Sequence, residues 1–361
     1  MSGRPPLLLH VFSTFAVGGP QMRFVALAGA LGLRYRHVVI AMDGVYACAD
    51  RLPPGLDLSC EPIDVAKGGT LGNVRRFRDR LRAIAPDLLV TYNWGAIEWA
   101  MANIPRRVRH LHVEDGFGPE ERARQLPRRV WTRRLVLARS TIVVPSRTLL
   151  RIATETWRLS PRRVHYIPNG IDLARFAGAH EAAAEPVVGT VAALRAEKNL
   201  GRLLRAFRLL PETLPARLVI AGDGPERTGL ERLAGDLGLA SRVEFTGYVA
   251  DPAPLYRRFD LVALSSDTEQ MPLSVIEAMA AGLPVAATDV GDIAAMVAKE
   301  NLAFVTPPDD AALAEALAAL LRDPDLRARV GAANRAKAAA EFALDTMVGA
   351  WRRMFDGEVR A

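Results

Sequence analysis

Short apolar runs alternate with helix-length stretches from one end of this 361-residue chain to the other. In the first half, runs rich in β-branched residues predict strands at 7–15, 36–42, 87–92, 109–113 and 140–145. The second half repeats the pattern, with strands expected at 186–194, 217–222, 242–247, 261–266, 284–289 and 303–307. Strands that alternate with helices form parallel sheets covered by helices on both faces. About twelve strands indicate two doubly wound α/β sheets facing each other across a cleft.

Several segments between and after these strands carry apolar residues at helical spacing. In 71–85 these residues are Leu71, Val74, Phe77, Leu81 and Ile84. In the segment after the strand at 186–194 they are Leu200, Leu203, Leu204 and Phe207. In the last 17 residues they are Met347, Trp351 and Met354, on one side of a helix.

A boundary between two domains is expected near Pro168-Asn169-Gly170, where a polar, alanine-rich stretch at 177–186 interrupts two periodic regions. We therefore expect an N-terminal Rossmann-like domain over 1–167 and a second one over 168–344. The helix at 345–361 is expected to pack back towards the N-terminal domain.

Composition excludes several classes of protein. Two cysteines cannot form a disulfide framework or a tetrahedral zinc site, which fits a reducing cytosol. No apolar run approaches the ~20 residues of a membrane-spanning helix. The apolar N-terminus reads as a first strand, because Pro5, Pro6 and His10 sit badly in a signal peptide. These features favour a cytoplasmic protein.

The net charge of +7 is unevenly distributed. Arginine outnumbers lysine 43 to 4, a bias that GC-rich coding alone could produce. Residues 104–163 nevertheless hold 15 arginines and 5 acidic residues, a local balance of +10. No nucleic-acid-binding motif accompanies this charge, so no nucleic-acid partner is expected.

The sequence S-D-T-E-Q-M-P-L-S-V-I-E-A-M-A-A-G at 266–282 follows an expected strand. A helix should start near Pro272 and Ser274 and carry Glu277 in its second turn. Met271, Pro272, Leu273 and Ser274, at its start, would lie against a diphosphate, which the free N–H groups of the helix end would bind. Glu269, in the loop before the helix, and Glu277 could bind different sugar hydroxyls, which carboxylates bind strongly. The alternative is a solvated acidic loop and a glutamate on a helix surface.

Two further loops follow expected strands. Arg195 and Lys198 leave one strand and open the next helix, so both cations could meet a departing diphosphate. Surface cations at such a junction are also common. Gly222 and Gly224 form a tight turn that passes close either to a ligand or to the neighbouring strand. Arg227 stands where a dinucleotide fingerprint needs its third glycine, which disfavours NAD.

Gly18-Gly19-Pro20 ends the first strand and opens a helix, with Pro20 suited to the first turn. Other motifs in the chain are P-N-G-I-D (168–172), A-G-D-G-P-E (221–226) and the E-x7-E pair that ends in E-A-M-A-A-G-x-P-V. On these motifs and on Gly18-Gly19, the chain resembles the retaining glycosyltransferases of family 4, which have the GT-B fold. The resemblance covers nearly the whole chain and is more specific in the C-terminal half. It implies that the loop at Gly18 and Gly19 approaches the donor phosphates, a structural turn being the alternative.

The resemblance implies roles for the candidate residues. Glu277 would hold the ribose hydroxyls and Glu269 the hydroxyls of the transferred sugar. Arg195 and Lys198 would neutralise the leaving diphosphate in place of a metal. His112 matches a histidine near the transferred sugar. His110 is its competitor, and a buried core histidine is the alternative for both.

We therefore expect a sugar to move from a UDP- or GDP-sugar to an acceptor hydroxyl, with retention and without metal or cofactor. A glycan or lipid-linked glycan is the expected acceptor, in cell-surface polysaccharide or glycolipid synthesis. The segment 104–163 could dock on an anionic membrane, peripherally at the inner face of the plasma membrane. A nucleotide-sugar 2-epimerase and a non-catalytic nucleotide-sugar-binding subunit remain as alternatives.

Overall fold

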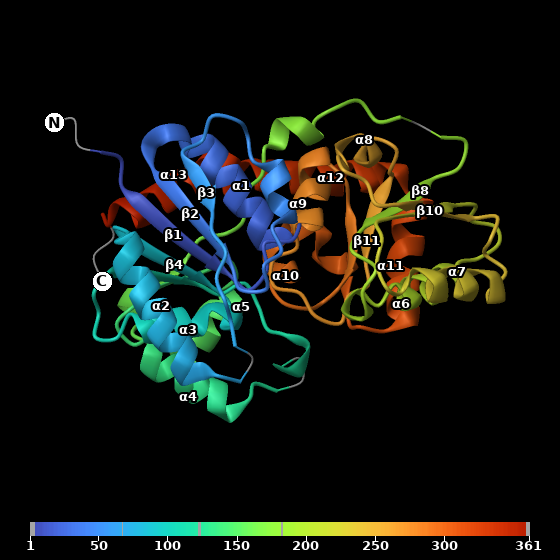
Figure 1. Ribbon diagram of the computed structural model, residues 1–361. Coiled ribbons are helices and arrows are strands. Elements are labelled where there is room, and N and C mark those ends of the chain that lie inside the picture. Colours follow the sequence, from blue (N-terminus) through green and yellow to red (C-terminus); the bar gives the residue numbers. More distant parts are fainter. Residues whose placement is uncertain (1–3, 67, 122–123, 182, 359–361) are drawn as a thin grey trace. The chain divides into compact units, whose positions relative to one another are not determined.

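The computed structural model describes residues 4–66, 68–121, 124–181 and 183–358. The chain divides into two compact units. Unit 1 comprises Met1–Pro168 together with Met347–Ala361, and unit 2 comprises Asn169–Thr346. Each unit is a parallel β-sheet with helices packed against it (Figure 1).

The sheet of unit 1 has the strand order β3-β2-β1-β4-β5-β6-β7, with every neighbouring pair parallel. Its strands are β1 (Leu7–Phe12), β2 (Arg36–Ala41), β3 (Leu58–Cys60), β4 (Leu88–Tyr92), β5 (Arg109–Val113), β6 (Thr141–Val144) and β7 (Val164–Tyr166). Its helices are α1 (Gly19–Leu31), α2 (Thr70–Ile84), α3 (Ile97–Ala102), α4 (Pro127–Val136), α5 (Arg147–Arg151) and, from Met347 onwards, α13 (Leu344–Asp356).

Helix α13 packs on unit 1 through its apolar side. Met347, Trp351 and Met354 are all buried. The Arg109 guanidinium, on β5, donates hydrogen bonds to the carbonyl oxygens of Met354 and Phe355 near the end of the helix. These bonds satisfy carbonyl groups that the last turn of a helix leaves unpaired.

The sheet of unit 2 has the order β10-β9-β8-β11-β12-β13, again with parallel neighbours. Its strands are β8 (Val187–Val191), β9 (Arg217–Ala221), β10 (Val243–Gly247), β11 (Leu261–Leu264), β12 (Val285–Thr288) and β13 (Val305–Thr306). Its helices are α6 (Leu200–Arg208), α7 (Arg227–Asp236), α8 (Ala253–Tyr256), α9 (Leu273–Ala281), α10 (Ile293–Met296), α11 (Asp310–Arg322) and α12 (Pro324–Glu341).

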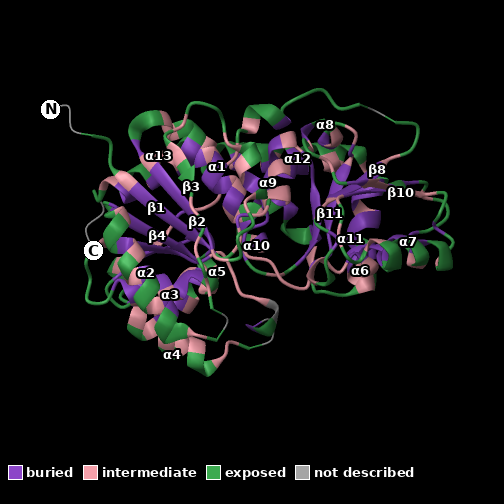
Figure 2. Ribbon diagram, in the orientation of Figure 1, coloured by how far each residue is buried: buried purple, intermediate pink, exposed green. Residues whose placement is uncertain are grey.

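The central strands are buried along their whole length, and the outer faces of the helices are exposed (Figure 2). Strands covered by helices on both faces have continuous apolar sequences, which is why they were predictable. The prediction of two parallel doubly wound sheets is confirmed. Strands β3 and β7 were missed, because they are short, partly exposed edge strands without an apolar run.

The expected apolar faces of two helices can be compared with the structure, and one agrees fully whereas the other agrees in part. Helix α6 buries all four apolar residues assigned to its inner face. In α2, Phe77 and Leu81 are buried, but Leu71 is 83% exposed. Leu71 lies in the first turn of α2, outside the apolar stripe that contacts the sheet.

Four histidines are buried on the strands of unit 1: His10, His37, His110 and His112. His10 Nε2 lies 3.1 Å from His37 Nδ1, and His110 Nδ1 lies 2.7 Å from Ser140 Oγ. Burial penalises the charged imidazolium, so it lowers the pKa of His37 to about 4 and that of His110 to about 3. His37 and His110 are therefore neutral in folded unit 1 near neutral pH.

We expect the free energy of unfolding of unit 1 to fall as the pH is lowered. Below a pH of about 6.5 the unfolded chain binds protons on these side chains, whereas the folded unit does not until about pH 4 and 3. The free energy of unfolding is thus highest above pH 6.5. It falls by on the order of several kcal/mol as the pH is lowered from about 6.5 to about 3. Denaturant unfolding at a series of pH values measures it.

A matched pair of variants isolates the histidines from the carboxylates that also titrate in acid. His110→Asn should lower the stability at neutral pH but make its fall between neutral pH and about pH 4 less steep. Arg208→Asn, at an exposed position of unit 2, should leave the profile unchanged. Identical slopes for the wild type and His110→Asn would contradict this explanation.

Candidate functional site

The strand order of unit 2 reverses between β8 and β11. On one side of this point the chain continues through β9 and β10, and on the other side through β12 and β13. In open parallel sheets, ligands bind outside the carboxyl ends of the strands at such a reversal. The segments that follow β8 and β11, 192–199 and 265–272, are therefore the place to look for a site.

These two segments are joined by hydrogen bonds at their carboxyl-end edge. The Ser265 hydroxyl donates to the Lys198 carbonyl oxygen over 3.1 Å, and the Asp267 N–H donates to the Glu197 carbonyl over 2.9 Å. The Asn199 amide donates to the Asp267 carboxylate over 3.0 Å. Backbone and side-chain groups from both segments take part, so the segments hold each other in a fixed arrangement.

An ion pair between Lys198 and Glu269 lies on this framework. The Lys198 Nζ is 2.6 Å from Glu269 Oε1, and the Ser266 hydroxyl donates to the same oxygen over 2.7 Å. The structure thus brings together two of the residues predicted from sequence, one from each segment. Ser266 was missed, although it opens the same motif.

The helix predicted to open at Arg195 and Lys198 begins later. Lys198 ends a 3₁₀ turn, Ala196–Lys198, and α6 begins at Leu200. Asn199 separates them, because it adopts a left-handed conformation (φ 41°) and caps α6 by accepting a hydrogen bond from Arg202 N–H. Arg195 is exposed, and its side chain makes no ion pair with any described residue.

Helix α9 begins as predicted, with Pro272 at its N-cap and Leu273 as its first residue. Glu277 lies in the second turn, half-buried, where its Oε2 accepts a 2.7 Å hydrogen bond from the Tyr256 hydroxyl. Burial raises the pKa of Glu277, while the Tyr256 hydrogen bond and the charge of Arg175 oppose the rise. Tyr256 and Arg175 were not predicted as neighbours of this glutamate.

The loop before α9 is held from two further directions. The Asn169 side chain donates to the Met271 carbonyl over 3.1 Å, and the Met271 side chain is buried. On the other side the Asp292 N–H donates to the Gln270 carbonyl over 3.2 Å. Gly291 has a positive φ of 63°, and a Cβ there would overlap the Glu269 backbone carbonyl. Gly291 was not predicted from sequence, although its position in the loop after a predicted strand could have indicated it.

The glycine turn after β9 is explained by its neighbouring strand. Gly222 has a φ of 140°, and a Cβ at this position would overlap the carbonyl oxygen of Ala192, just after β8. A Cβ at Gly224 would lie 2.5 Å from the Leu194 carbonyl oxygen. Of the two explanations left open by the sequence, close approach to the neighbouring strand therefore accounts for both glycines.

In unit 1 the strand order reverses between β1 and β4. Gly18 is the N-cap of α1 and Pro20 lies in its first turn, as predicted. A Cβ at Gly18 would meet the Gln21 side chain at 2.8 Å, whereas a Cβ at Gly19 would meet nothing within 4 Å in the described structure. The end of the Gln21 side chain can shift, so packing within the described chain requires a glycine at neither position.

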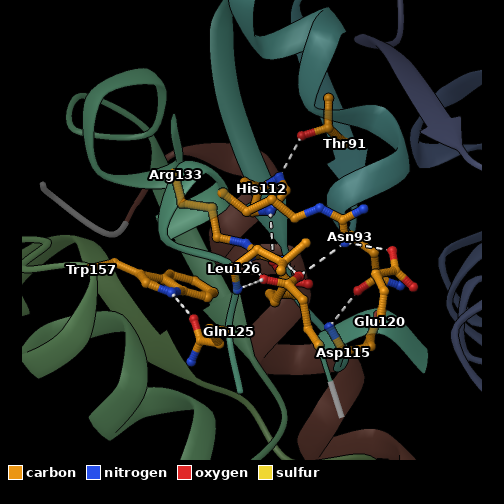
Figure 3. A network of polar contacts seen from close by, with 12 residues as sticks. Thr91, Asn93, His112, Asp115, Glu120, Gln125, Leu126, Arg133 and Trp157 are labelled. Atoms are coloured by element: carbon orange, nitrogen blue, oxygen red, sulfur yellow. Dashed lines mark hydrogen bonds and ion pairs between the residues drawn. The ribbon is translucent and has the colours of Figure 1, made fainter. Parts of the chain in front are cut away.

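His112 is fully buried in unit 1, as is the side chain of Thr91 on the adjacent strand. His112 Nδ1 lies 2.8 Å from Thr91 Oγ1, and its Nε2 lies 3.5 Å from Glu114 Oε2 (Figure 3). His110 Nε2 also lies 2.8 Å from Thr91 Oγ1. Both ring nitrogens of His112 thus lie near protein groups, and its role towards the transferred sugar stays a prediction.

Arg133 connects this network to the following loop. Its guanidinium contacts Glu114 at 3.2 Å and both oxygens of Glu121 at 3.1 Å (Figure 3). It also lies over the rings of Trp94 and Trp157, at 5.0 and 4.9 Å. All three charged side chains are fully buried. Removing one partner of such a network leaves a buried charge uncompensated.

The basic surface expected over 104–163 is therefore smaller than the sequence suggests. Arg133 is buried, and Arg129 forms ion pairs with Glu120 at 2.6 Å and Glu121 at 3.1 Å. Arg128 remains exposed. Two of the four arginines of α4, Arg129 and Arg133, thus stabilise the loop and are largely withdrawn from solvent.

A second buried ion pair fixes the same loop at its start. Arg23, on α1, donates to both carboxylate oxygens of Asp115 at 2.6 and 2.9 Å. The Asp115 N–H in turn donates to Asn93 Oδ1 over 2.7 Å (Figure 3). Arg23 was not identified from sequence, although it is a charged residue among apolar ones in an inward-facing helix.

Two acidic strings that could suggest a metal, Asp309-Asp310 and Asp323-Pro324-Asp325, begin with helix caps. Asp309 accepts hydrogen bonds from Ala311 and Ala312 N–H at the start of α11, and Asp323 accepts one from Leu326 N–H at the start of α12. Within residues 4–66, 68–121, 124–181 and 183–358, no cluster of three or more histidine, cysteine or carboxylate side chains could hold a metal. No described helix is long and apolar enough to span a membrane.

Solved structures of similar architecture include that of Anabaena Alr3699/HepE in complex with UDP and glucose. It superposes with a TM-score of 0.82 over 97% of this chain and 99% of that one, at 20% identity. The glycosyltransferase WaaG, involved in lipopolysaccharide biosynthesis, superposes with a TM-score of 0.72 over 96% of this chain and 99% of its own, at 19% identity. At these identities the likeness shows the GT-B fold alone.

Sequence comparison identifies the family. The sequence model "Glycosyltransferase Family 4" matches residues 17–175, and "Glycosyl transferases group 1" matches residues 176–337. The chain is 30% identical to EpsF of Bacillus subtilis (strain 168) over 80% of each protein. It is 28% identical to the D-inositol 3-phosphate glycosyltransferase of Corynebacterium urealyticum (strain ATCC 43042 / DSM 7109), over 81% of this chain and 76% of that protein. The chain therefore belongs to the family 4 glycosyltransferases of GT-B fold.

Proposed function

We propose that this glycosyltransferase moves a hexose from a UDP- or GDP-sugar to an acceptor hydroxyl, with retention of anomeric configuration. The observation that carries the proposal is the Lys198–Glu269 pair at the β8/β11 reversal, with Glu277 of the same motif in the second turn of α9. A cation for phosphate and two carboxylates for hydroxyls are the groups that a sugar nucleotide requires. The HepE complexes with UDP and with UDP-glucose add support from a protein of the same fold.

We assign the ribose hydroxyls to Glu277 and the hydroxyls of the transferred sugar to Glu269. The start of α9, Met271 to Ser274, lies against the diphosphate, and the N–H groups of its residues other than Pro272 donate to it. Lys198 and Arg195 counter the charge that grows on the diphosphate as the glycosidic bond breaks, which is the task that a metal performs elsewhere. Gly18 and Gly19, where a Cβ would meet only the Gln21 side chain or nothing within 4 Å of the described structure, are our proposed contacts for the donor phosphates. We keep His112, on β5, as the candidate contact of the transferred sugar.

A carboxylate nucleophile would have to lie within bonding reach of the anomeric carbon. Glu269 already serves to hold hydroxyls in this assignment. We therefore propose that the leaving group departs and the acceptor attacks on the same face of the sugar, with a donor phosphate oxygen helping to deprotonate the acceptor.

We further propose that the acceptor is a glycan or lipid-linked glycan of a cell-surface polysaccharide or glycolipid, reached at the cytoplasmic face of the membrane. On α4, Trp131 and Leu135 are 58% and 70% exposed and lie one turn apart. Arg128 is exposed beside them, and the Arg134 guanidinium lies 5.1 Å from the Trp131 ring. Exposed apolar side chains flanked by arginines suit an anionic lipid surface.

Replacing Glu277 with alanine should weaken nucleotide binding. The hydrogen bonds to ribose exist in ground and transition states alike, so the change should appear in KM and in the affinity for the free nucleotide. We expect a loss on the order of 1.5–3 kcal/mol, typical of hydrogen bonds to a charged group. The probe is whichever of UDP, GDP and ADP stabilises the wild type in a thermal-shift screen.

The control is Glu212→Ala, at an exposed loop position before β9, which should bind the probe as the wild type does. Calorimetry then compares the three proteins. Equal nucleotide affinity for Glu277→Ala and the wild type would remove Glu277 from the site.

Arg195→Ala and Lys198→Ala should lower kcat more than they lower donor affinity. Phosphate charge grows during the reaction, so interactions with these cations strengthen in the transition state. Steady-state transfer kinetics, with Arg208→Ala at the exposed end of α6 as control, separates the two effects. Activity should also persist in EDTA; loss of activity that Mn²⁺ restores would contradict the assignment of this task to the cations.

Replacing Arg128, Trp131 and Arg134 together (Arg128→Gln, Trp131→Ala and Arg134→Gln) should abolish binding to vesicles of anionic lipid. Each arginine near such a surface contributes on the order of 1 kcal/mol, so binding should also weaken with salt. The control, Arg208→Gln with Arg232→Gln, removes the same charge from exposed positions of unit 2 and should still co-sediment. A wild type that ignores anionic vesicles at low ionic strength points to a soluble acceptor.

A further inference from the structure

The two oxygens of the Glu269 carboxylate are in different surroundings. Oε1 accepts a hydrogen bond from the Ser266 hydroxyl and pairs with the Lys198 ammonium. Oε2 has no hydrogen-bond partner among the described residues. One oxygen is thus held by the protein and the other remains available to a ligand.

Glu269 is also the one anionic partner of Lys198 within the described chain. The two side chains are 9% and 23% exposed, so the pair is partly withdrawn from water and its charges are weakly screened. A lysine whose charge is neutralised by a neighbouring carboxylate attracts a phosphate less than a free lysine does. The Glu269 carboxylate also repels a phosphate that approaches the same ammonium.

Ser266 is held in place more firmly than Lys198. It is 1% exposed, two residues after β11, and its carbonyl oxygen accepts a 2.7 Å hydrogen bond from the Thr288 hydroxyl on β12. A lysine has four rotatable side-chain bonds and can turn to a new partner. The serine therefore keeps its contact with Glu269 Oε1 when the lysine moves.

We propose that Glu269 and the donor diphosphate compete for Lys198, and that Ser266 is a positioning residue that holds Glu269 once Lys198 has turned to the diphosphate. Arrival of the diphosphate then frees the carboxylate for the sugar hydroxyls, so that binding of the two halves of the donor is coupled. This inference rests on the proposed function, because it requires a nucleoside diphosphate at this site.

The direction in which a substitution of Glu269 changes the diphosphate affinity tests whether Glu269 and the diphosphate compete for Lys198. Glu269→Gln removes the competing charge and keeps the size of the side chain, so the affinity for the free nucleoside diphosphate should rise several-fold. The rise should shrink at high salt, since it is electrostatic. Glu212→Gln, at an exposed position, should leave the affinity unchanged. In a Lys198→Gln background, Glu269→Gln should no longer strengthen binding, because the shared partner is absent.

Ser266→Ala tests the positioning role separately. Diphosphate affinity should stay at or above the wild-type value, whereas kcat for transfer falls and the intact donor sugar loses its advantage over the free diphosphate. A purely structural role would instead lower the melting temperature and weaken both ligands together. That outcome would overturn the role of Ser266.

Calorimetry with UDP, GDP and ADP distinguishes a failure of the proposed function from a failure of this inference alone. A wild type that binds none of them contradicts both the proposed function and this inference. A wild type that binds one of them, with a Glu269→Gln variant that binds it equally or more weakly, overturns the inference and leaves the proposed function standing.

Discussion

The reversal of strand order between β8 and β11 is the constraint on which the arrangement in unit 2 depends. It places two loops from distant parts of the sequence at one edge of the sheet, and hydrogen bonds through Ser265 and Asp267 join them. Lys198 and Glu269 meet because their loops meet. The ion pair is therefore a consequence of topology, and a preorganised cation–carboxylate pair costs little reorganisation when a ligand replaces one partner.

Unit 1 uses its charged residues in a different way. Glu114, Glu121 and Arg133 lie in a fully buried network, and Arg23 with Asp115 forms a second ion pair that is nearly as deep. Such pairs contribute less net stability than their Coulomb energy suggests, because both charges lose hydration. Their effect here is geometric, since they fix the segment 114–121 between α1 and α4. Charge counted along a sequence is thus a poor measure of charge at a surface.

Much of the fold was predictable because the central strands are buried on both faces and read as continuous apolar runs. The edge strands β3 and β7 lack that signal. The candidate site was predictable where one motif contains it, as for Glu269 and the start of α9. Tyr256 and Gly291 were missed because they reach the motif only through the folded chain. The start of α6 was misplaced because the left-handed Asn199 interrupts the chain between Lys198 and the helix.

The central claim is that the loops after β8 and β11 bind the donor. Hydrogen–deuterium exchange of the full chain with and without the cognate nucleotide tests this claim most directly, because backbone amides report binding without any substitution. The account predicts slower exchange in 195–199 and 265–275, with the rest of unit 2 largely unchanged. Protection confined to other segments, in the presence of a nucleotide that binds, would contradict it.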